Sequence, residues 1–178
     1  MKIIETDIAD VKIIEPDVFG DQRGWFLESW HESKFAENVL KVQFKQDNVS
    51  SSSKGVLRGL HFQTEQSQGK LIQVLVGEVY DVAVDIRKNS PTYGQWVGVL
   101  LSESNRRQMW IPEGFAHGFY VLSEQAICTY KCTDLYHPKS EVCIRWDDPE
   151  LCIDWPLLGE PIISSKDAKG IDFKALCI

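Results

Sequence analysis

The chain has 178 residues, 43% hydrophobic and 25% charged, which is typical of one globular domain with a substantial core. Its 19 Lys and Arg against 26 Asp and Glu give a net charge of −7, so it lacks the basic excess that binding to a nucleic-acid backbone requires. No apolar stretch approaches the roughly 18 residues needed to span a bilayer, and residues 1–10 lack the apolar block of a secretory signal. We therefore expect a single domain over residues 1–178 in the cytoplasm, with neither nucleic acid nor membrane as a partner.

Short segments rich in Val, Ile, Thr and aromatic residues alternate with turn-forming residues, the pattern of an all-β domain. In chain order, the predicted strands cover residues 12–15, 25–30, 44–50, 57–62, 70–76, 78–87, 95–101, 109–111, 118–122, 126–133 and 142–146. One short peripheral helix is predicted at residues 32–40, where Phe35, Val39 and Leu40 share a face. The Pro-containing segment from residue 147 onward is expected to form a carboxy-terminal extension with one or two helical turns that packs over the strands. So many strands in one domain imply a sandwich or a barrel.

The predicted strand 78–87 alternates strictly between two faces. One face carries Tyr80, Val82, Val84 and Ile86, and the other carries Val79, Asp81, Ala83, Asp85 and Arg87. If the second face looks outward, Asp81 is a surface residue. If it looks into the interior of a barrel, Asp81 can orient a histidine. The alternation alone leaves both possibilities open.

The cysteine count bears on the redox compartment. The five cysteines are Cys128, Cys132, Cys143, Cys152 and Cys177. An odd number favours reduced, mostly buried thiols over a disulfide framework, which agrees with a cytoplasmic location. No second Cys or His pair accompanies Cys128 and Cys132 to complete a zinc site.

Two histidines stand in distinctive segments, His61 in LRGLHFQ (57–63) and His117 in PEGFAHGF (112–119). The spacing Pro-x-Gly-x-x-His resembles the second motif of the cupin superfamily, which folds as a double-sheet jelly roll. Metal-binding cupins carry two further histidines, one residue apart, in their first motif, whereas this chain has Gln63 two positions after His61. The resemblance therefore implies a cupin without a metal, and it disfavours a metal-dependent dioxygenase or isomerase.

Seven segments, in the same order, resemble those of dTDP-4-dehydrorhamnose 3,5-epimerases. They are FGDQRG at 19–24, QDN at 46–48, LRGLHFQ at 57–63, GKL at 69–71, GEVYDVAVD at 77–85, IPEGFAHGF at 111–119 and YK at 130–131. The similarity extends over residues 8–168, and the last ten residues match no motif of the family. It implies a cupin-type jelly roll with short peripheral helices, no cofactor, and a homodimer in which the amino-terminal segment is exchanged or lies at the interface.

The resemblance also implies a reaction. The family inverts C3 and C5, the two carbons that flank the C4 ketone of a dTDP-linked 4-keto-6-deoxyhexose, and so converts dTDP-4-dehydro-6-deoxy-D-glucose to dTDP-4-dehydro-L-rhamnose in dTDP-L-rhamnose biosynthesis. Such a reaction needs a base on one face of the sugar, an acid on the other, and a group that holds the enolate charge. By position in the motifs, His61 is the base with Asp167 as its carboxylate partner, Tyr130 is the acid, and Lys70 is the cation near the C4 oxygen.

A second set of residues matches the family's substrate contacts. Arg23, Arg58 and Lys166 match positions that contact the diphosphate or nucleotide, and Glu28, Gln46, Asn48 and Glu141 match polar contacts. Tyr136 matches an aromatic ring that stacks on thymine, and His117 with Asp81 matches a second oriented imidazole beside the sugar. A few local cations would thus bind one nucleotide sugar within an acidic protein.

Two other functions stay open on the sequence alone. An epimerase that acts only at C3 of a related nucleotide 4-keto deoxysugar would carry the same catalytic residues. A non-catalytic sugar-binding cupin would keep the pocket but lose the base or the acid, and this chain retains both His61 and Tyr130.

Overall fold

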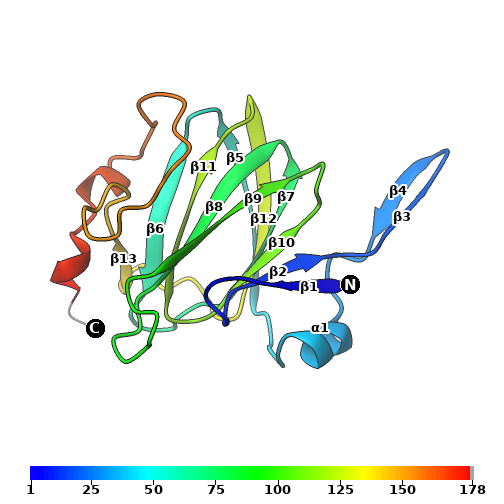
Figure 1. Ribbon diagram of the computed structural model, residues 1–178, viewed down its shortest axis with the longest axis horizontal. Coiled ribbons are helices and arrows are strands. Elements are labelled where there is room, and N and C mark those ends of the chain that lie inside the picture. The colour runs from blue at the N-terminus through cyan, green and yellow to red at the C-terminus, as the bar shows by residue number, and fades with distance from the viewer. Residues whose placement is uncertain (177–178) are drawn as a thin grey trace.

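Two antiparallel β-sheets face each other in the computed structural model, which describes residues 1–176 (Figure 1). The larger sheet has six strands in the order β1 (Lys2–Glu5), β2 (Lys12–Glu15), β10 (Gln108–Ile111), β7 (Lys70–Val76), β12 (Gln125–Cys132) and β5 (Gln46–Ser53). The smaller sheet has five, in the order β13 (Glu141–Cys143), β6 (Leu57–Gln63), β11 (Phe115–Val121), β8 (Glu78–Asp85) and β9 (Trp96–Ser102). This arrangement is the double-sheet jelly roll that the sequence predicted.

The main core lies between the two sheets, where inward-facing side chains of both interdigitate. Its members include Ile72, Val74, Val79, Ala83, Val99, Leu101, Met109, Phe119 and Cys128. Strand β8 is buried on both faces, because Val79 and Ala83 belong to this core while Val82 and Val84 belong to a second core on the outer side of the sheet. Asp81 lies on the inward face with no exposed surface. The polar face of residues 78–87 therefore looks into the interior.

The carboxy-terminal extension covers the outer face of the five-stranded sheet. Leu151, Trp155, Phe173 and Leu176 of the extension pack against outward-facing residues of β6, β8 and β11. Two short 3₁₀ turns lie within it, η1 (Asp167–Lys169) and η2 (Phe173–Ala175), as predicted. The first of them places Asp167 beside β6, so this covering segment also delivers a side chain to the interior.

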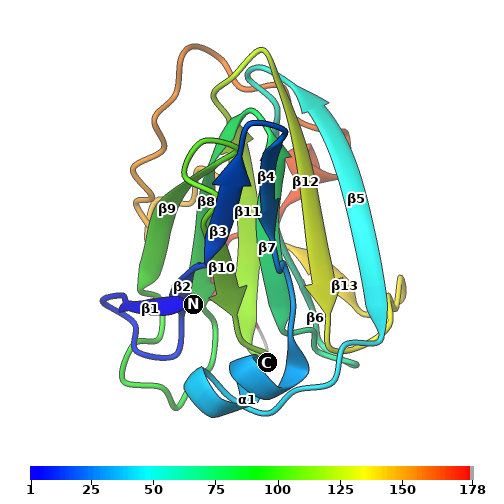
Figure 2. The same ribbon diagram turned by 90° about the vertical axis from the view of Figure 1, so that its right-hand side faces the viewer.

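Helix α1 (Glu32–Asn38) packs on the outer face of the six-stranded sheet at the lower end of its strands in Figure 2. Its buried residue Phe35 stacks edge-on against Trp110 of β10 at 5.5 Å between ring centroids. The helix begins at its cap His31, whose Nδ1 accepts a hydrogen bond from the Lys34 backbone, and it ends two residues before the predicted boundary. No helix within residues 1–176 is long and apolar enough to cross a membrane.

The amino-terminal region differs most from the sequence prediction. Strand β1 was not predicted, and the predicted strand 25–30 is shorter, since β4 (Gly24–Leu27) pairs with an unpredicted β3 (Val18–Asp21) to form a separate hairpin. This hairpin projects away from the two sheets in Figure 1. Both missed strands have only four residues and carry charged or glycine positions, so their periodicity is too short to detect.

Four of the cysteines lie in the described residues, and all four are free. Cys128 and Cys132 are buried, as predicted, and Cys143 is half-buried. Cys152 is exposed, which the prediction of mostly buried thiols did not anticipate for this position. Cys177 lies outside residues 1–176.

Candidate active site

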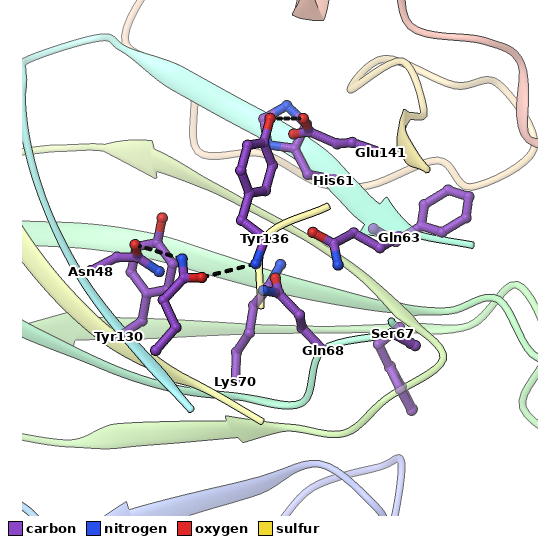
Figure 3. Close-up of a pocket in the computed structure, with 12 residues that line it drawn as sticks. Asn48, His61, Gln63, Ser67, Gln68, Lys70, Tyr130, Tyr136 and Glu141 are labelled. Carbon is purple, nitrogen blue, oxygen red and sulfur yellow. Dashed lines mark hydrogen bonds between the residues drawn. The ribbon is translucent and has the colours of Figure 1, made fainter. Parts of the chain in front are cut away.

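A cavity of about 300 Å³ lies between the two sheets (Figure 3). The five-stranded sheet contributes side chains from β6, β11 and β13, the six-stranded sheet contributes side chains from β5, β7 and β12, and the loops supply the rest. The lining residues are Gln46, Asn48, His61, Phe62, Gln63, Ser67, Gln68, Lys70, Phe115, Tyr130, Tyr136 and Glu141. Seven of the fourteen site residues predicted from the sequence are therefore in its wall.

His61 forms a hydrogen-bonded pair with Asp167. The distance from His61 Nε2 to Asp167 Oδ1 is 2.6 Å, and the carboxylate is almost fully buried whereas 28% of the imidazole surface is exposed toward the cavity. Burial alone would raise the pKa of Asp167, but the hydrogen bond and charge of His61 outweigh it and hold that pKa below its usual value. The ionised carboxylate fixes the ring orientation and leaves Nδ1 as the nitrogen available to a ligand.

The position of His61 depends on a bulge in β6. His61 pairs with His117 of β11, but two residues further along β11, Phe119 pairs with Arg58, so β6 contains one extra residue in this interval. The extra residue allows Arg58 and His61, which are three apart in sequence, to share the inward face. Gly59 has φ of +116° and lies so close to β11 that a Cβ atom would be 2.5 Å from Gly118 Cα, so only glycine fits here.

His117 forms a second imidazole–carboxylate pair beside the first. Its Nε2 lies 3.0 and 3.1 Å from the two carboxylate oxygens of Asp81, which has no exposed surface. Burial lowers the pKa of His117, and the positive charge of Lys70 acts in the same direction while Asp81 opposes it. This settles the orientation of Asp81, because it contacts a histidine in the interior.

Lys70 and Tyr130 lie on the wall opposite His61, since β7 and β12 belong to the six-stranded sheet and β6 to the other (Figure 3). Lys70 is buried, and desolvation lowers the pKa of its ammonium group although Asp81 and Glu141 act to raise it. Burial raises the pKa of Tyr130, so its phenol keeps the proton at neutral pH. A ligand in the cavity would thus have an imidazole on one side and a phenol and an ammonium group on the other.

Three glutamine side chains hold the backbone of the loop that carries Tyr136. Gln63 donates to the Leu135 carbonyl and accepts from the His137 N–H at 3.2 and 2.9 Å, and a further donation to the Gln66 carbonyl at 2.7 Å anchors its amide. Gln68 donates to the Asp134 carbonyl at 2.8 Å, and Gln46 accepts from the Tyr136 N–H at 2.8 Å. Gln63 occupies the strand position at which metal-binding cupins carry a histidine, and here its amide holds the loop that carries Tyr136.

Tyr136, Glu141 and Lys166 form a polar cluster at the cavity. The phenol of Tyr136 donates to Glu141 Oε2 at 2.5 Å, and Lys166 forms an ion pair with the same carboxylate oxygen. Burial raises the pKa of Glu141, but the hydrogen bonds from Lys166 and Tyr136 bring it below its usual value. Half of the Tyr136 surface is exposed, which leaves the ring face free for stacking.

Of the seven predicted residues that are not in the cavity wall, Asp167, His117, Asp81 and Lys166 contact residues described above, and the other three are Arg58, Arg23 and Glu28. Arg58 reaches across to the other sheet, where its Nε donates to Ser52 Oγ at 2.9 Å. Arg23 is on the β3–β4 hairpin, largely exposed and paired with Asp21, and Glu28 follows the hairpin and pairs with Lys34 of α1. Within one chain, then, Arg23 and Glu28 are not brought to the cavity, because the hairpin that carries them projects away from the sheets.

Other residues of the site were not predicted. Gln63 shares the inward face of β6 with His61, so the two-residue alternation of a strand was a usable signal for it. Ser67 and Gln68 lie in a loop that carries no periodic signal. Cys143 pairs with His61 across β13 and β6, and its Sγ lies 3.8 Å from Asp167 Oδ1. Only the strand register reveals this proximity.

The chain resembles known proteins over nearly its whole length. Residues 5–175 match the family model described as dTDP-4-dehydrorhamnose 3,5-epimerase. The Salmonella typhimurium protein of that name is 59% identical, with 94% of this chain and 93% of the relative covered. A crystal structure of the 3,5-epimerase of Legionella pneumophila in complex with dTDP-4-keto-L-rhamnose is 57% identical with a TM-score of 0.97, covering 98% of this chain and 94% of that one.

A more distant structure is also similar. It is a 3'-monoepimerase from Streptomyces bikiniensis in complex with dTDP-quinovose, 29% identical with a TM-score of 0.90, covering 96% of this chain and 87% of that one. The fold is therefore shared by proteins named for double and for single epimerisation, while the sequence stands much nearer the former. The chain belongs to the dTDP-4-dehydrorhamnose 3,5-epimerase family.

Proposed function

We propose that this chain, acting as a single domain, converts dTDP-4-dehydro-6-deoxy-D-glucose to dTDP-4-dehydro-L-rhamnose in dTDP-L-rhamnose biosynthesis. The observation that carries the proposal is the position of His61 and Tyr130 on opposite sheets across one cavity. Inversion at carbon requires a proton to leave one face and another to arrive at the opposite face, and this pair supplies a base and an acid with that geometry.

His61 is the base. The Asp167 carboxylate holds the proton of Nε2 at 2.6 Å, so Nδ1 carries the lone pair that accepts a proton from C3 or C5. When the imidazole becomes positively charged, the buried carboxylate stabilises it.

Lys70 and Tyr130 act on the enolate. Removal of the proton moves an electron pair to the C4 oxygen, and the ammonium group of Lys70 stabilises that charge in an enclosed site. The Tyr130 phenol then gives its proton to the carbon on the opposite face, which restores the ketone with inverted configuration. Before the second carbon reacts, His61 releases its proton to solvent and Tyr130 takes one up from solvent, so the reaction is a sequence of proton transfers without net oxidation and needs no redox cofactor.

The remaining cavity residues bind the rest of the substrate. Tyr136 stacks on thymine, with Gln46 and Asn48 as polar contacts at the same end; Gln46 also donates to Asn48 at 3.0 Å. Arg58 and Lys166 contact the diphosphate, for which guanidinium and ammonium groups are suitable partners. Glu141 is a further polar contact, and His117, oriented by Asp81, contacts the sugar.

We also propose that the protein is a homodimer in which the β3–β4 hairpin of one chain covers the cavity of the other. Phe19, Trp25 and Phe26 of the hairpin are each more than half exposed, an apolar surface that a monomer rarely leaves uncovered. Arg23 on this hairpin and Glu28 just after it would then reach the substrate of the partner chain. This arrangement would account for their distance from the cavity of their own chain.

Mixed dimers test the exchange. If Arg23 serves the partner's cavity, a dimer of one Arg23→Ala chain and one His61→Asn chain contains one intact site, so random mixing of the two inactive variants restores about a quarter of the wild-type activity. If Arg23 serves its own cavity, every site carries a lesion and mixing restores nothing. Light scattering of the wild-type protein reports the dimer independently.

A cytoplasmic location is part of the proposal. It is supported by the four free thiols of residues 1–176, one of them exposed, which suit a reducing compartment.

The function is tested by proton exchange with a matched binding control. His61→Asn should slow exchange of the substrate's C3 and C5 protons by at least about a hundredfold, because the base is lost. The affinity for dTDP should stay within about twofold, since the nucleotide contacts are other residues. Unchanged exchange would remove His61 from the role of base, and an absence of exchange in the wild-type protein would contradict the proposed reaction.

A further inference from the structure

Cys143 lies beside the His61–Asp167 pair and has no part in the proposed reaction. It is the direct cross-strand partner of His61, on β13 and β6, and its Sγ is 3.8 Å from Asp167 Oδ1. The potential ligand atoms of His61, Cys143 and Asp167 all lie within 4.8 Å of one another. The structure therefore brings a nitrogen, a sulfur and an oxygen atom together at the catalytic base.

These three atoms fit the requirements of a borderline divalent cation. Zn²⁺ binds imidazole nitrogen, thiolate sulfur and carboxylate oxygen at about 2.0 to 2.3 Å, which in a tetrahedral site places ligand atoms about 3.3 to 3.6 Å apart. The Cys143–Asp167 separation of 3.8 Å is already close to that range. The His61–Asp167 separation of 2.6 Å must widen by less than about 1 Å, which a small side-chain rotation achieves.

We propose that His61, Cys143 and Asp167 form an inhibitory site for Zn²⁺ or a similar thiolate-binding cation such as Cd²⁺, with a water molecule as the fourth ligand. The His61 imidazole is shared between this site and the cavity wall, so a bound cation acts directly on the proposed base. The inhibition rests on the proposed function, whereas the binding of the cation does not.

The protons account for the inhibition. On binding, Cys143 loses its thiol proton to solvent and coordinates as thiolate, while Asp167 coordinates as the carboxylate. The Nε2 nitrogen of His61, which in the free protein holds a proton toward Asp167, must offer its lone pair to the cation, and the imidazole stays neutral by carrying its proton on Nδ1. Nδ1 then has no lone pair for the substrate, so the base is lost although every side chain remains in place.

Binding is tested without substrate by titrating the full-length protein with Cd²⁺ and following the ultraviolet absorption of the cadmium–thiolate bond. We expect one cation per chain in the wild-type protein, loss of this signal in Cys143→Ser, and an affinity weakened by at least about tenfold in His61→Asn. Cys152→Ser is the matched control, since Cys152 is exposed and away from the pair, and it should leave the signal intact. Circular dichroism verifies that each variant is folded.

Several outcomes would contradict the proposed cation site at His61, Cys143 and Asp167. They are the absence of any cadmium–thiolate signal in the wild-type protein, an unchanged signal in Cys143→Ser, loss of the signal in Cys152→Ser, and unchanged affinity in His61→Asn.

Inhibition is tested separately, as the ratio of substrate proton-exchange rates with and without saturating Zn²⁺. This ratio should fall by at least about tenfold in the wild-type protein and in Cys152→Ser, and stay near one in Cys143→Ser. A rate that Zn²⁺ raises, or an equal fall in Cys143→Ser, would contradict inhibition through this site. If the wild-type protein shows no exchange at all, the proposed function fails, while the Cd²⁺ titration still decides whether the site exists.

Discussion

His61 and His117 lie directly opposite each other on β6 and β11, and each imidazole is hydrogen bonded to a buried carboxylate of its own, Asp167 for the first and Asp81 for the second. The two carboxylates come from different parts of the fold, one from the carboxy-terminal extension and one from the central strand β8. The positive charge of Lys70 and that of a protonated His61 both disfavour a charge on His117. Burial, together with these charges, lowers the pKa of His117 and so favours its neutral imidazole.

Replacing the Asp167 carboxylate should leave the His61 imidazole in place but remove the group that orients it. In Asp167→Asn an amide replaces the acceptor that holds the proton on Nε2 of His61, so the wrong tautomer faces the substrate. We expect kcat to fall by about a hundredfold or more with KM changed little, as measured by steady-state conversion of the 4-keto substrate. Asp172→Asn, at an exposed ion pair with Arg145, is the matched control and should retain full activity. Equal kcat values in the two variants would show that the pair does not act in catalysis.

The burial of Lys70 leads to a prediction about alkaline pH. Because desolvation lowers its pKa, the ammonium group loses its proton at a lower pH than an ordinary lysine, and kcat should fall as the pH rises through that value. In Lys70→Arg the guanidinium group keeps its charge to a much higher pH than an ammonium group, so the kcat of this variant, although reduced, should stay constant to a higher pH. Lys70→Met should lose about a hundredfold in kcat at neutral pH. If kcat falls at the same alkaline pH in the wild-type protein and in Lys70→Arg, the decrease is caused by a group other than Lys70.

Gln63 should affect substrate binding without taking part in the chemistry. Gln63→Leu removes the hydrogen bonds that hold the backbone at Leu135 and His137, and Tyr136 between them loses its fixed position. We expect KM to rise about tenfold with kcat within about threefold of the wild type, a separation that a general loss of folding would not produce. Gln95→Leu, outside the cavity, is the matched control. A fall in kcat with unchanged KM would contradict this positioning role.

Asp85 is predicted to stabilise the fold from outside the cavity. It has no exposed surface and accepts hydrogen bonds from Arg87, Ser90 and Thr92, which together outweigh the effect of burial and lower its pKa to about 2. A carboxyl whose folded pKa lies below its unfolded value contributes stability that is complete above the unfolded pKa. That contribution, about 2 kcal/mol here, is lost as the pH falls from about 4 toward about 2.

Urea unfolding of Asp85→Asn checks this account. At neutral pH the variant should be about 2 to 4 kcal/mol less stable than the wild type, and the difference should shrink below pH of about 4. Asp47→Asn, at an exposed ion pair with Lys131, should change the free energy of unfolding by less than about 1 kcal/mol. A difference that stayed constant down to pH of about 2 would show that the carboxylate charge is not what stabilises the fold.

Local patterns predicted the fold class, whereas the seven residues of the cavity wall that were predicted came from the resemblance to the family. The alternation in residues 78–87 identified the two faces of β8, and the motifs that contain His61 and His117 lie on β6 and β11. The sequence did not predict which face of β8 looked inward, since that depends on the carboxy-terminal extension that covers the other face.

Two features of the site could not be predicted from residue patterns. The bulge that places Arg58 and His61 on one face lies where Gly59 closely approaches Gly118, and the proximity of Cys143 comes from the register of β13 against β6. Both are set by pairing between segments far apart in sequence. The direction of the β3–β4 hairpin, which carries Arg23 away from the cavity of its own chain, likewise has no signal in its two four-residue strands.

The central claim is that one cavity inverts both carbons beside the ketone, and isotope incorporation tests it most directly. The wild-type protein is incubated with dTDP-4-dehydro-6-deoxy-D-glucose in D₂O, and the sugar is examined by NMR for deuterium at each position. Because His61, Lys70 and Tyr130 surround a single cavity that can present either carbon to the same base, we predict deuterium at both C3 and C5. Deuterium at C3 alone would contradict the double epimerisation and identify the protein as a single epimerase.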